Sequence, residues 1–409
     1  MIPFSPPRID QKIINEVVDA LKSGWITTGP RTKRFEKELA AYCGAPAVVC
    51  LNSATAGLEV MLRWFGVGEG DEVIVPAYTY AATANVVVHC GARPVFVDVN
   101  ADDFNVSLAA VEAAITPRTK VVMPVDLGGW PCAYDELNDL VKDKAALFQP
   151  RTDEQRKLGR VLVLADSAHS IGARYKGRRT GALCDVAVFS FHAVKNLTTA
   201  EGGAVALNLP EPFSNEELYK TLCVKTLHGQ NKDALAKTQK GNWKYDIVEA
   251  GYKCNMTDIV AAIGLVELAR YDADTLVKRR RVMDAYAAAL SRHEWAEVPV
   301  FDRDGRTSSC HLFPLRVRGI DEAARDRIIQ RIFDRDVSVN VHYIPVPRMS
   351  FYRGLGYQMA DYPVAYDNFA REISLPVFYD ITDEQVAEVV GAVVAAVREE
   401  LSPGATPAG

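Results

Sequence analysis

Short, uninterrupted runs of apolar residues, many of them β-branched, alternate with helical patterns along much of this chain. In order, the runs are AVVCL, EVIVP, RPVFVDV, KVVMPVD, RVLVLAD and DVAVFSF. Strands without polar alternation are typical of a sheet that is buried on both faces. Because these strands alternate with helices, the sequence predicts an α/β fold with a mostly parallel central sheet covered by helices. In such sheets, ligands bind beyond the carboxyl ends of the strands.

The pattern changes near residue 271, where long helical stretches and short strands replace the alternation. The predicted helices are ADTLVKRRRVMDAYAAALSRH, EAARDRIIQRIFDRD and TDEQVAEVVGAVVAAVREEL, and the predicted strands are HLFPLRV and SVNVHYI. We therefore expect a large α/β domain over residues 1–270 and a smaller α+β domain over 271–401. Residues 402–409 are small and polar and are expected to be disordered. The polar segment 142–160 is interpreted as a surface excursion without chemistry.

The composition favours small-molecule chemistry. A formal net charge of -5 argues against a general nucleic-acid-binding protein, which normally carries a strongly basic face. The eight cysteines are scattered without a CxxC pair, and no histidine cluster has metal-ligand spacing, so we expect reduced thiols and no metal. No signal-peptide pattern is present, and the uncharged stretch 73–92 is interpreted as a buried strand, turn and helix. We therefore expect a cytoplasmic protein that binds neither membrane nor nucleic acid.

Chemically useful side chains follow several of the predicted strands. Residues 52–56, NSATA, begin a helix whose free N–H groups suit a phosphate, although this segment alone favours an ordinary helix cap. Asp166 ends an apolar strand, where a carboxylate is costly unless it has a cationic partner or caps a helix. Tyr80 follows another strand and either covers a flat ligand or packs in a core or dimer interface.

Lys195 lies in SFHAVKNLTTAEGG, after a predicted strand that ends near Ser190. Taken alone, it is more readily a solvated loop lysine than a reactive amine. Together, however, these residues match what pyridoxal 5'-phosphate requires: a phosphate-binding helix start, a buried carboxylate, an aromatic ring that covers the cofactor and a lysine. The carboxylate would keep the ring nitrogen of this cofactor protonated, and the lysine would bind the cofactor covalently and move protons.

Longer motifs extend this pattern in a fixed order. They are SGWITTGPRTKRFEKELAAYCGA, NSATAGLEVML, VPAYTYAATANVVVHCGARPVFVDV, ADSAHSIGARYKGRRTG, FSFHAVKNLTTAEGGAV, GYKCNMTDIVAAIGLVEL, VHYIPVP and ISLPVFYDITDEQV. In these motifs, and over nearly its whole length, the sequence resembles the DegT/DnrJ/EryC1/StrS family of sugar aminotransferases. The resemblance implies the fold type I architecture of aspartate aminotransferase. One departure is DLGGWP, with Asp126 and Gly128, where the family often reads His-Leu-Tyr-Gly, so the contacts of this loop are left open.

The resemblance implies a role for each residue at the cofactor. Lys195 would hold the cofactor covalently, and Asp166 would pair with its pyridine nitrogen. His169 would lie near its phenolic oxygen, and Tyr80 would stack on its ring. The phosphate would be held by Ala54, which replaces a family glycine, with Thr55 and Ser190.

The resemblance also implies a homodimer with shared active sites, because Asn255 would reach the phosphate from the other subunit. The residues expected to face the substrate are Trp25 and Thr27, which resemble lid residues, and His228, His342 and Tyr343. A basic run near His228 is interpreted either as a solvated face or as a site for a diphosphate; it comprises Lys232, Lys237, Lys240 and Lys244.

The implied activity is a two-step transfer for surface polysaccharide, glycan or amino-sugar biosynthesis. L-Glutamate would leave as 2-oxoglutarate, and a nucleotide-linked keto sugar, for example a 4-keto-6-deoxyhexose, would then receive the amino group. Two alternatives are a dehydratase of the same fold and a non-catalytic regulatory relative. Lys195 argues against the dehydratase, which has histidine at this position, and the presence of both Asp166 and Lys195 argues against the regulator.

Overall fold

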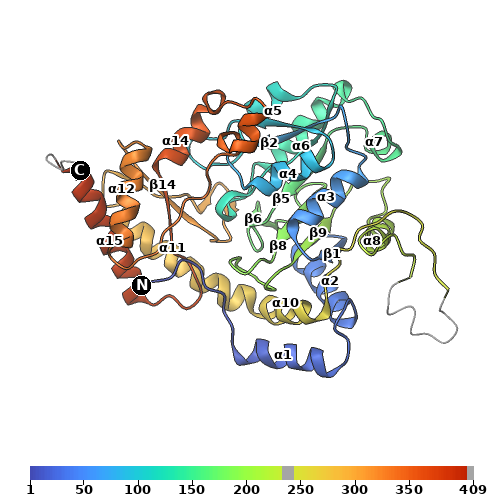
Figure 1. The fold of residues 1–409 in the computed structure, drawn as a ribbon, viewed down its shortest axis with the longest axis horizontal. Coiled ribbons are helices and arrows are strands. Elements are labelled where there is room, and N and C mark those ends of the chain that lie inside the picture. The colour runs from blue at the N-terminus through green and yellow to red at the C-terminus, as the bar shows by residue number, and fades with distance from the viewer. Residues whose placement is uncertain (233–243, 403–409) are drawn as a thin grey trace.

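The computed structural model of the chain, which describes residues 1–232 and 244–402, confirms the expected α/β architecture (Figure 1). Its main sheet has the strand order β1-β9-β8-β5-β4-β2-β3. β9 runs antiparallel to β1 and β8, and the remaining neighbouring strands pair in parallel. The bounds are β1 Ala47–Leu51, β2 Glu72–Pro76, β3 Arg93–Val97, β4 Thr119–Val122, β5 Leu162–Asp166, β8 Val186–Ser190 and β9 Gly203–Leu207.

The central strands are apolar because both of their faces are covered. Every residue of β1, β2, β4, β5, β8 and β9 is buried. Two of the covering helices show the expected local signals, since α2 begins with Pro30 and α3 is capped by the Ser53 side chain, which accepts from the N–H of Ala56. The helices of this region are α1 Gln11–Lys22, α2 Pro30–Cys43, α3 Ala54–Trp64, α4 Ala81–His89, α5 Leu108–Ala114, α6 Tyr134–Asp143, α7 Asp153–Leu158, α8 Asn215–Lys225 and α10 Asp258–Arg270.

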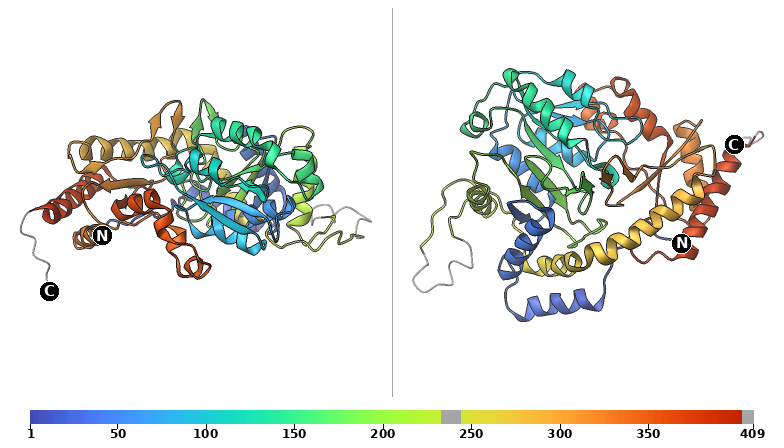
Figure 2. Two further views of the ribbon diagram at one scale, coloured as in Figure 1. Left: turned by 90° about the horizontal axis from the view of Figure 1, so that it is seen from above. Right: turned by 180° about the vertical axis from the view of Figure 1, so that it is seen from behind.

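A second region with its own apolar core lies beside the first when the molecule is seen from above (Figure 2). It is built on the antiparallel sheet β10-β13-β14, with strands Ala296–Glu297, Phe313–Val317 and Glu372–Leu375. Its helices are α11 Leu276–Leu290, α12 Glu322–Phe333, α13 Ser350–Gly354, α14 Pro363–Arg371 and α15 Asp383–Leu401. Short strands form a separate sheet between the regions: β6 Arg174–Tyr175, β7 Arg178–Arg179, β11 Asp302–Arg303 and β12 Arg306–Thr307.

One continuous helical run joins the two cores. α10 passes through the π-helical turn Tyr271–Thr275 directly into α11 (Figure 1). α10 contributes Leu265 and Leu268 to the first core, whereas α11 contributes Val282 and Tyr286 to the second. The division at residue 270 stays a prediction, and part of the C-terminal half, including Val346 and Phe369, packs in the first core.

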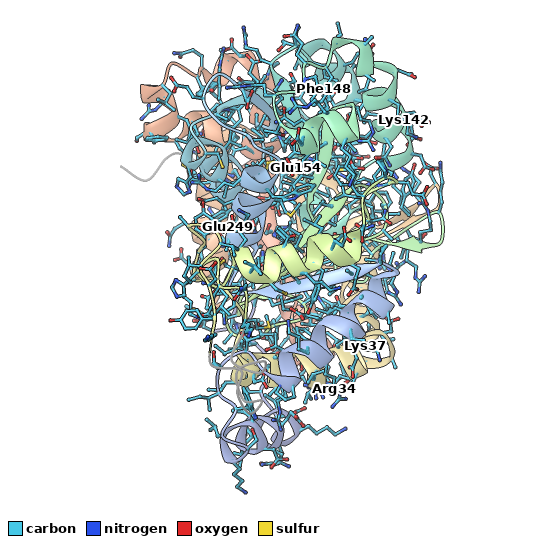
Figure 3. The ribbon with its side chains drawn as sticks, turned by 90° about the vertical axis from the view of Figure 1, so that its right-hand side faces the viewer. Arg34, Lys37, Lys142, Phe148, Glu154 and Glu249 are labelled. Carbon is cyan, nitrogen blue, oxygen red and sulfur yellow. The ribbon has the colours of Figure 1, made fainter. Side chains whose placement is uncertain are left out.

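One local expectation differs from the structure. Residues 338–344 are predicted to form a strand, but they make only an isolated bridge, Asn340 to Ser374, and the strands that pair with β13 are β10 and β14. The segment 142–160 lies mainly at the surface, as expected, and two of its residues anchor it. Within it, the Gln155 side chain is buried and donates to the carbonyl of Phe65 at 2.9 Å, and Phe148 is also buried. Figure 3 shows Lys142, Phe148 and Glu154 on the face that carries α8.

In the part of the chain that the structure describes, no helix is both long and apolar enough to cross a membrane. Ser402 is the last described residue, so the rest of the expected tail lies outside the described residues.

Candidate active site

A cavity of about 560 Å³ lies beyond the carboxyl ends of the central strands. Asp166 and Ser190 are the last residues of β5 and β8, and α3 and α4 begin beside them after β1 and β2. Because parallel strands end at one edge of the sheet, segments distant in the sequence meet here. The predicted residues that line this cavity are Ala54, Thr55, Tyr80, Asp166, His169, Ser190, Lys195, His342 and Tyr343.

Asp166 is a buried carboxylate with neutral donors around it. It accepts hydrogen bonds from the Thr83 hydroxyl at 2.8 Å and from the N–H of Ala168 at 3.3 Å. Burial raises the pKa of Asp166, while these two hydrogen bonds and the charge of Lys195 act in the opposite direction. A cation that entered the cavity beside Asp166 would therefore relieve the cost of its burial.

Lys195 lies on the loop between β8 and β9. Among the described residues, none accepts a hydrogen bond from its amine, and the residue is partly buried on the wall of the cavity. Burial lowers the pKa of Lys195 to about 8, and the charge of Asp166 acts against this shift. A lysine with a lowered pKa has a substantial unprotonated fraction near neutral pH, and that fraction is a nucleophile and a base.

The start of α3 forms one wall of the cavity with Ser53, Ala54 and Thr55. Gly203, the first residue of β9, lies so close that a Cβ atom there would stand 2.4 Å from the nitrogen of Ala54. Only glycine allows this approach, which brings the end of β8 and the helix start together. With the Ser190 hydroxyl nearby, the arrangement suits a phosphate group.

His169 is held as a neutral imidazole. Its Nδ1 accepts from the N–H of Gly128 at 3.2 Å, so Nε2 carries the proton and donates to the Tyr343 hydroxyl at 3.0 Å. Burial first, and then the charges of Lys195 and His342, lower the pKa of His169 well below its ordinary value. The Tyr343 hydroxyl is thereby left to donate its own proton toward a ligand.

Tyr80 caps the start of α4 and presents an open aromatic face. Its side chain is 62% exposed although it lines the cavity, and its ring lies 5.6 Å from that of Tyr343. An exposed aromatic at the edge of a cavity is well placed to cover a flat ring.

Asp126, in the loop that departs from the family pattern, does not line the cavity. It is fully buried and accepts from the N–H of Cys132 and from the hydroxyls of Tyr134, Ser167 and Ser170. Burial raises its pKa, and these hydrogen bonds act against the shift. Asp126 therefore fixes the loop after Asp166, while Gly128 orients His169.

The other predicted residues lie outside this cavity. Thr27 and His228 are exposed, and the segment of Trp25 and Thr27 packs against the start of α10, where the carbonyl of Thr27 accepts from the N–H of Asp258. Asn255 donates to the Thr28 hydroxyl at 2.6 Å. In the basic run, Lys232 and Lys244 are described, and Lys237 and Lys240 lie outside the described residues.

Sequence reasoning missed several residues that support the site. Thr83 bonds to Asp166, Asn196 bonds to His311 at 2.8 Å, and Ser374 bonds to His342 at 2.9 Å. The only sequence signal for Asn196 was its position next to Lys195. Thr83 and Ser374 lie on segments far in the sequence from the residues they contact, and the sequence pattern does not predict these contacts. Within the described ranges, no cluster of His, Cys, Asp and Glu side chains is arranged to hold a metal ion.

The cavity combines an aspartate at the end of β5, a lysine on the loop after β8, a helix start that Gly203 approaches closely and an exposed aromatic ring. These features are those of a pyridoxal-phosphate-dependent transferase of fold type I. The sequence profile of the DegT/DnrJ/EryC1/StrS aminotransferase family matches residues 7–394. The chain belongs to this family, and its cofactor is pyridoxal 5'-phosphate.

Relatives cover nearly the whole chain. The spore coat polysaccharide biosynthesis protein SpsC of Bacillus subtilis is 36% identical over 399 residues, which is 96% of each chain. A putative sugar aminotransferase of Streptococcus pneumoniae, in its PMP form, is 45% identical with a TM-score of 0.95, covering 98% of this chain and 100% of the other. PseC of Helicobacter pylori, an aminotransferase involved in the biosynthesis of pseudoaminic acid, is 26% identical with a TM-score of 0.85, covering 97% and 98%.

Proposed function

We propose that this sugar aminotransferase moves the amino group of L-glutamate to a nucleotide-linked keto sugar, for surface polysaccharide or amino-sugar biosynthesis. The observation that carries the proposal is the Lys195 amine, unbonded to any described residue, beside the buried carboxylate of Asp166 in one cavity. The names of SpsC and PseC point to polysaccharide and sugar-acid biosynthesis, which supports a sugar precursor as the acceptor.

Each residue has a role that follows from its surroundings. Pyridoxal phosphate, when bound, supplies a ring that withdraws electrons from a carbon next to the substrate nitrogen. We assign Asp166 to the ring nitrogen, the start of α3 with Ser190 to the phosphate, and Tyr80 to the ring face. His169 with Tyr343 would donate to the phenolic oxygen.

Lys195 would take the proton from the α-carbon of the amino donor. It would then deliver a proton to the cofactor carbon that carries the transferred amino group. A pKa of about 8 suits both steps, because the amine gives up and accepts a proton near neutral pH. Donor and acceptor would use the cavity in turn, so the kinetics are expected to be ping-pong.

We also propose a homodimer in which the partner completes each cavity. Asn255, Trp25, Thr27 and His228 lie outside the Lys195 cavity of their own chain, which is consistent with a role in the other subunit. α1 supports an interface, since Ile14, Val18 and Leu21 recur at helical spacing on its exposed side. The proposal covers transfer of the amino group to either carbon three or carbon four of the hexose.

The visible spectrum of the cofactor-loaded protein tests the proposal. We expect L-glutamate to bleach the band of the lysine-bound cofactor and release 2-oxoglutarate, and keto sugar nucleotides to restore the band. Lys195→Ala should lack both changes, whereas Lys176→Ala, which changes a surface amine, should behave as wild type. A wild-type spectrum that L-glutamate and other amino donors leave unchanged would refute the transfer.

A further inference from the structure

His342, on the wall of the cavity, belongs to a closed ring of hydrogen bonds that the proposed reaction does not yet use. Its Nδ1 lies 2.9 Å from the Ser374 hydroxyl, and this hydroxyl lies 2.5 Å from Oε1 of Glu372. The ring closes where the backbone N–H of His342 donates to Oε2 of the same carboxyl at 3.0 Å. Glu372 and Ser374 are both fully buried on β14, so no water competes for these hydrogen bonds.

Other contacts hold the imidazole in place. The ring of Phe4 stacks on it at 5.4 Å, and the ring of Tyr343 meets it edge-on at 5.0 Å. The carbonyl of His342 accepts from the Tyr78 hydroxyl at 2.7 Å. Nδ1 is therefore committed to Ser374, whereas Nε2 has no hydrogen-bond partner in the described part of the chain.

The hydrogen bonds of this closed ring can run in two directions, depending on the protonation of Glu372. When Glu372 is ionised, it can only accept, so the Ser374 hydroxyl donates to it and accepts from Nδ1–H of His342. Nε2 then presents a lone pair to the cavity. When Glu372 is protonated, its O–H donates to Ser374, the Ser374 hydroxyl donates to Nδ1, and Nε2 carries the proton instead. One proton on Glu372 thus changes the cavity side of His342 from acceptor to donor.

We propose that Glu372 and Ser374 are positioning residues that set the tautomer of His342, so that Nε2 becomes an acceptor for a hydroxyl group of the sugar substrate when Glu372 is ionised. The inference rests on the proposed function for its substrate. A neutral acceptor at this point fits a sugar hydroxyl and does not fit the carboxylate of an amino donor or a diphosphate, neither of which has a proton to give in the pH range where Glu372 is ionised.

The surroundings of Glu372 set the pH at which the hydrogen bonds of this ring reverse their direction. Burial raises the pKa of Glu372 to about 8, against the hydrogen bonds from Ser374 and the N–H of His342 and the charges of Arg325 on α12 and Arg316 on β13. Tyr78 and Tyr343 face it as neutral phenols, since burial raises the pKa of each. Burial and the charge of Lys195 lower the pKa of His342 to about 4, so the imidazole is neutral throughout this range.

Nitrogen NMR of the histidine-labelled, cofactor-loaded enzyme reads the tautomer directly, with His342 assigned by its loss in His342→Gln. Between about pH 6 and pH 10, the proton should move from Nε2 to Nδ1 as the pH rises through the pKa of Glu372. Glu372→Gln keeps the shape of the ring but its amide donates to Ser374, so Nε2 should carry the proton at every pH. Ser374→Ala should leave a mixture of tautomers that does not respond to pH.

Kinetics of the separate half-reactions test the sugar contact. At about pH 9, where Glu372 is mainly ionised, we expect Glu372→Gln and Ser374→Ala to raise the KM for the keto sugar about tenfold and to change the glutamate half-reaction less than twofold. Glu36→Gln is the matched control, because Glu36 is also a buried hydrogen-bonded carboxyl, but its partners are the N–H of Cys50 and the Tyr219 hydroxyl rather than His342 and Ser374. Glu36→Gln should change neither the KM for the keto sugar nor the glutamate half-reaction.

A tautomer that ignores both pH and Glu372→Gln would overturn the proposal, as would equal losses in both half-reactions. If no keto sugar is accepted at all, the proposed function fails while the NMR result still decides whether the ring controls His342.

Discussion

Asp166 and Lys195 offset the effect of burial on each other's charge. Burial raises the pKa of the carboxyl and lowers that of the amine to about 8, and in each case the charge of the partner acts in the opposite direction. The pair therefore keeps a negative and a reactive basic group in one cavity where either alone would tend to become neutral.

Replacing the carboxylate should make the lysine titrate at lower pH. In Asp166→Asn, the charge that raises the pKa of Lys195 is gone, so labelling of its amine should reach half its maximal rate below the wild-type midpoint near pH 8. Mass spectrometry after brief labelling of the cofactor-free protein measures both midpoints. The surface amine of Lys176, whose hydrogen bond with Asp135 raises its pKa to about 12, is the internal control. Equal midpoints for Lys195 in the two proteins would contradict the pairing.

A methyl group at Gly203 should weaken the phosphate site. In Gly203→Ala, the new Cβ would stand 2.4 Å from the nitrogen of Ala54, so the start of α3 must move. We expect the affinity for pyridoxal phosphate to fall about tenfold or more, measured by titration of the cofactor band. Gly391→Ala places its Cβ in open space within α15 and should leave the affinity unchanged while stabilising the helix by about 1 kcal/mol. Unaltered binding in Gly203→Ala would show that this approach is not needed.

Asp126 should be required for stability. Asp126→Ala leaves the hydroxyls of Tyr134, Ser167 and Ser170 and the N–H of Cys132 without their acceptor in a buried site. We expect a loss of about 3 kcal/mol or more, seen as a lower midpoint of chemical denaturation at fixed protein concentration. Asp135→Ala, which removes two solvent-exposed ion pairs, with Lys176 and Arg178, should change the midpoint little. A midpoint close to that of wild type in Asp126→Ala would assign the loop a different anchor.

Shared active sites predict complementation between inactive variants. Lys195→Ala and Asn255→Ala should each be nearly inactive, but subunits mixed, dissociated and reassociated should recover about a quarter of wild-type activity, because half of the dimers then carry one intact site. Lys195→Ala mixed with Asp166→Ala should recover nothing, since both residues line the cavity of one chain. If the first mixture stays inactive although the variants exchange subunits, Asn255 does not act across an interface.

The sequence predicted the edge of the sheet at which the site lies, because parallel strands end together. Asp166 and Ser190 could be placed there from strand patterns alone, and their neighbour Lys195 followed from the same reasoning. β9 escaped prediction because GAVAL consists mainly of small residues and follows a glycine-rich loop. Its antiparallel direction depends on pairing with β1 and β8, which local sequence does not encode.

Long-range side-chain contacts were also beyond the sequence. Nothing in VHYIPVP indicates that His342 meets Ser374, because their approach depends on the bridge between Asn340 and Ser374, two residues far apart in the sequence. Asp126 illustrates a different limit. Its departure from the family pattern marked the loop as unusual, but only burial and four hydrogen bonds identify it as an anchor rather than a ligand contact.

The unbroken passage from α10 into α11 has a practical consequence for anyone who wishes to produce the two regions as separate fragments. A cut at residue 270 would fall inside a helix, one residue before the buried Tyr271, whose hydroxyl donates to the carbonyl of Ile171 at 2.9 Å. The downstream fragment would also keep Val346 and Phe369, which would lose the apolar surface they cover. Such fragments should aggregate, so this enzyme is best cloned, labelled and crystallised as one uncut polypeptide.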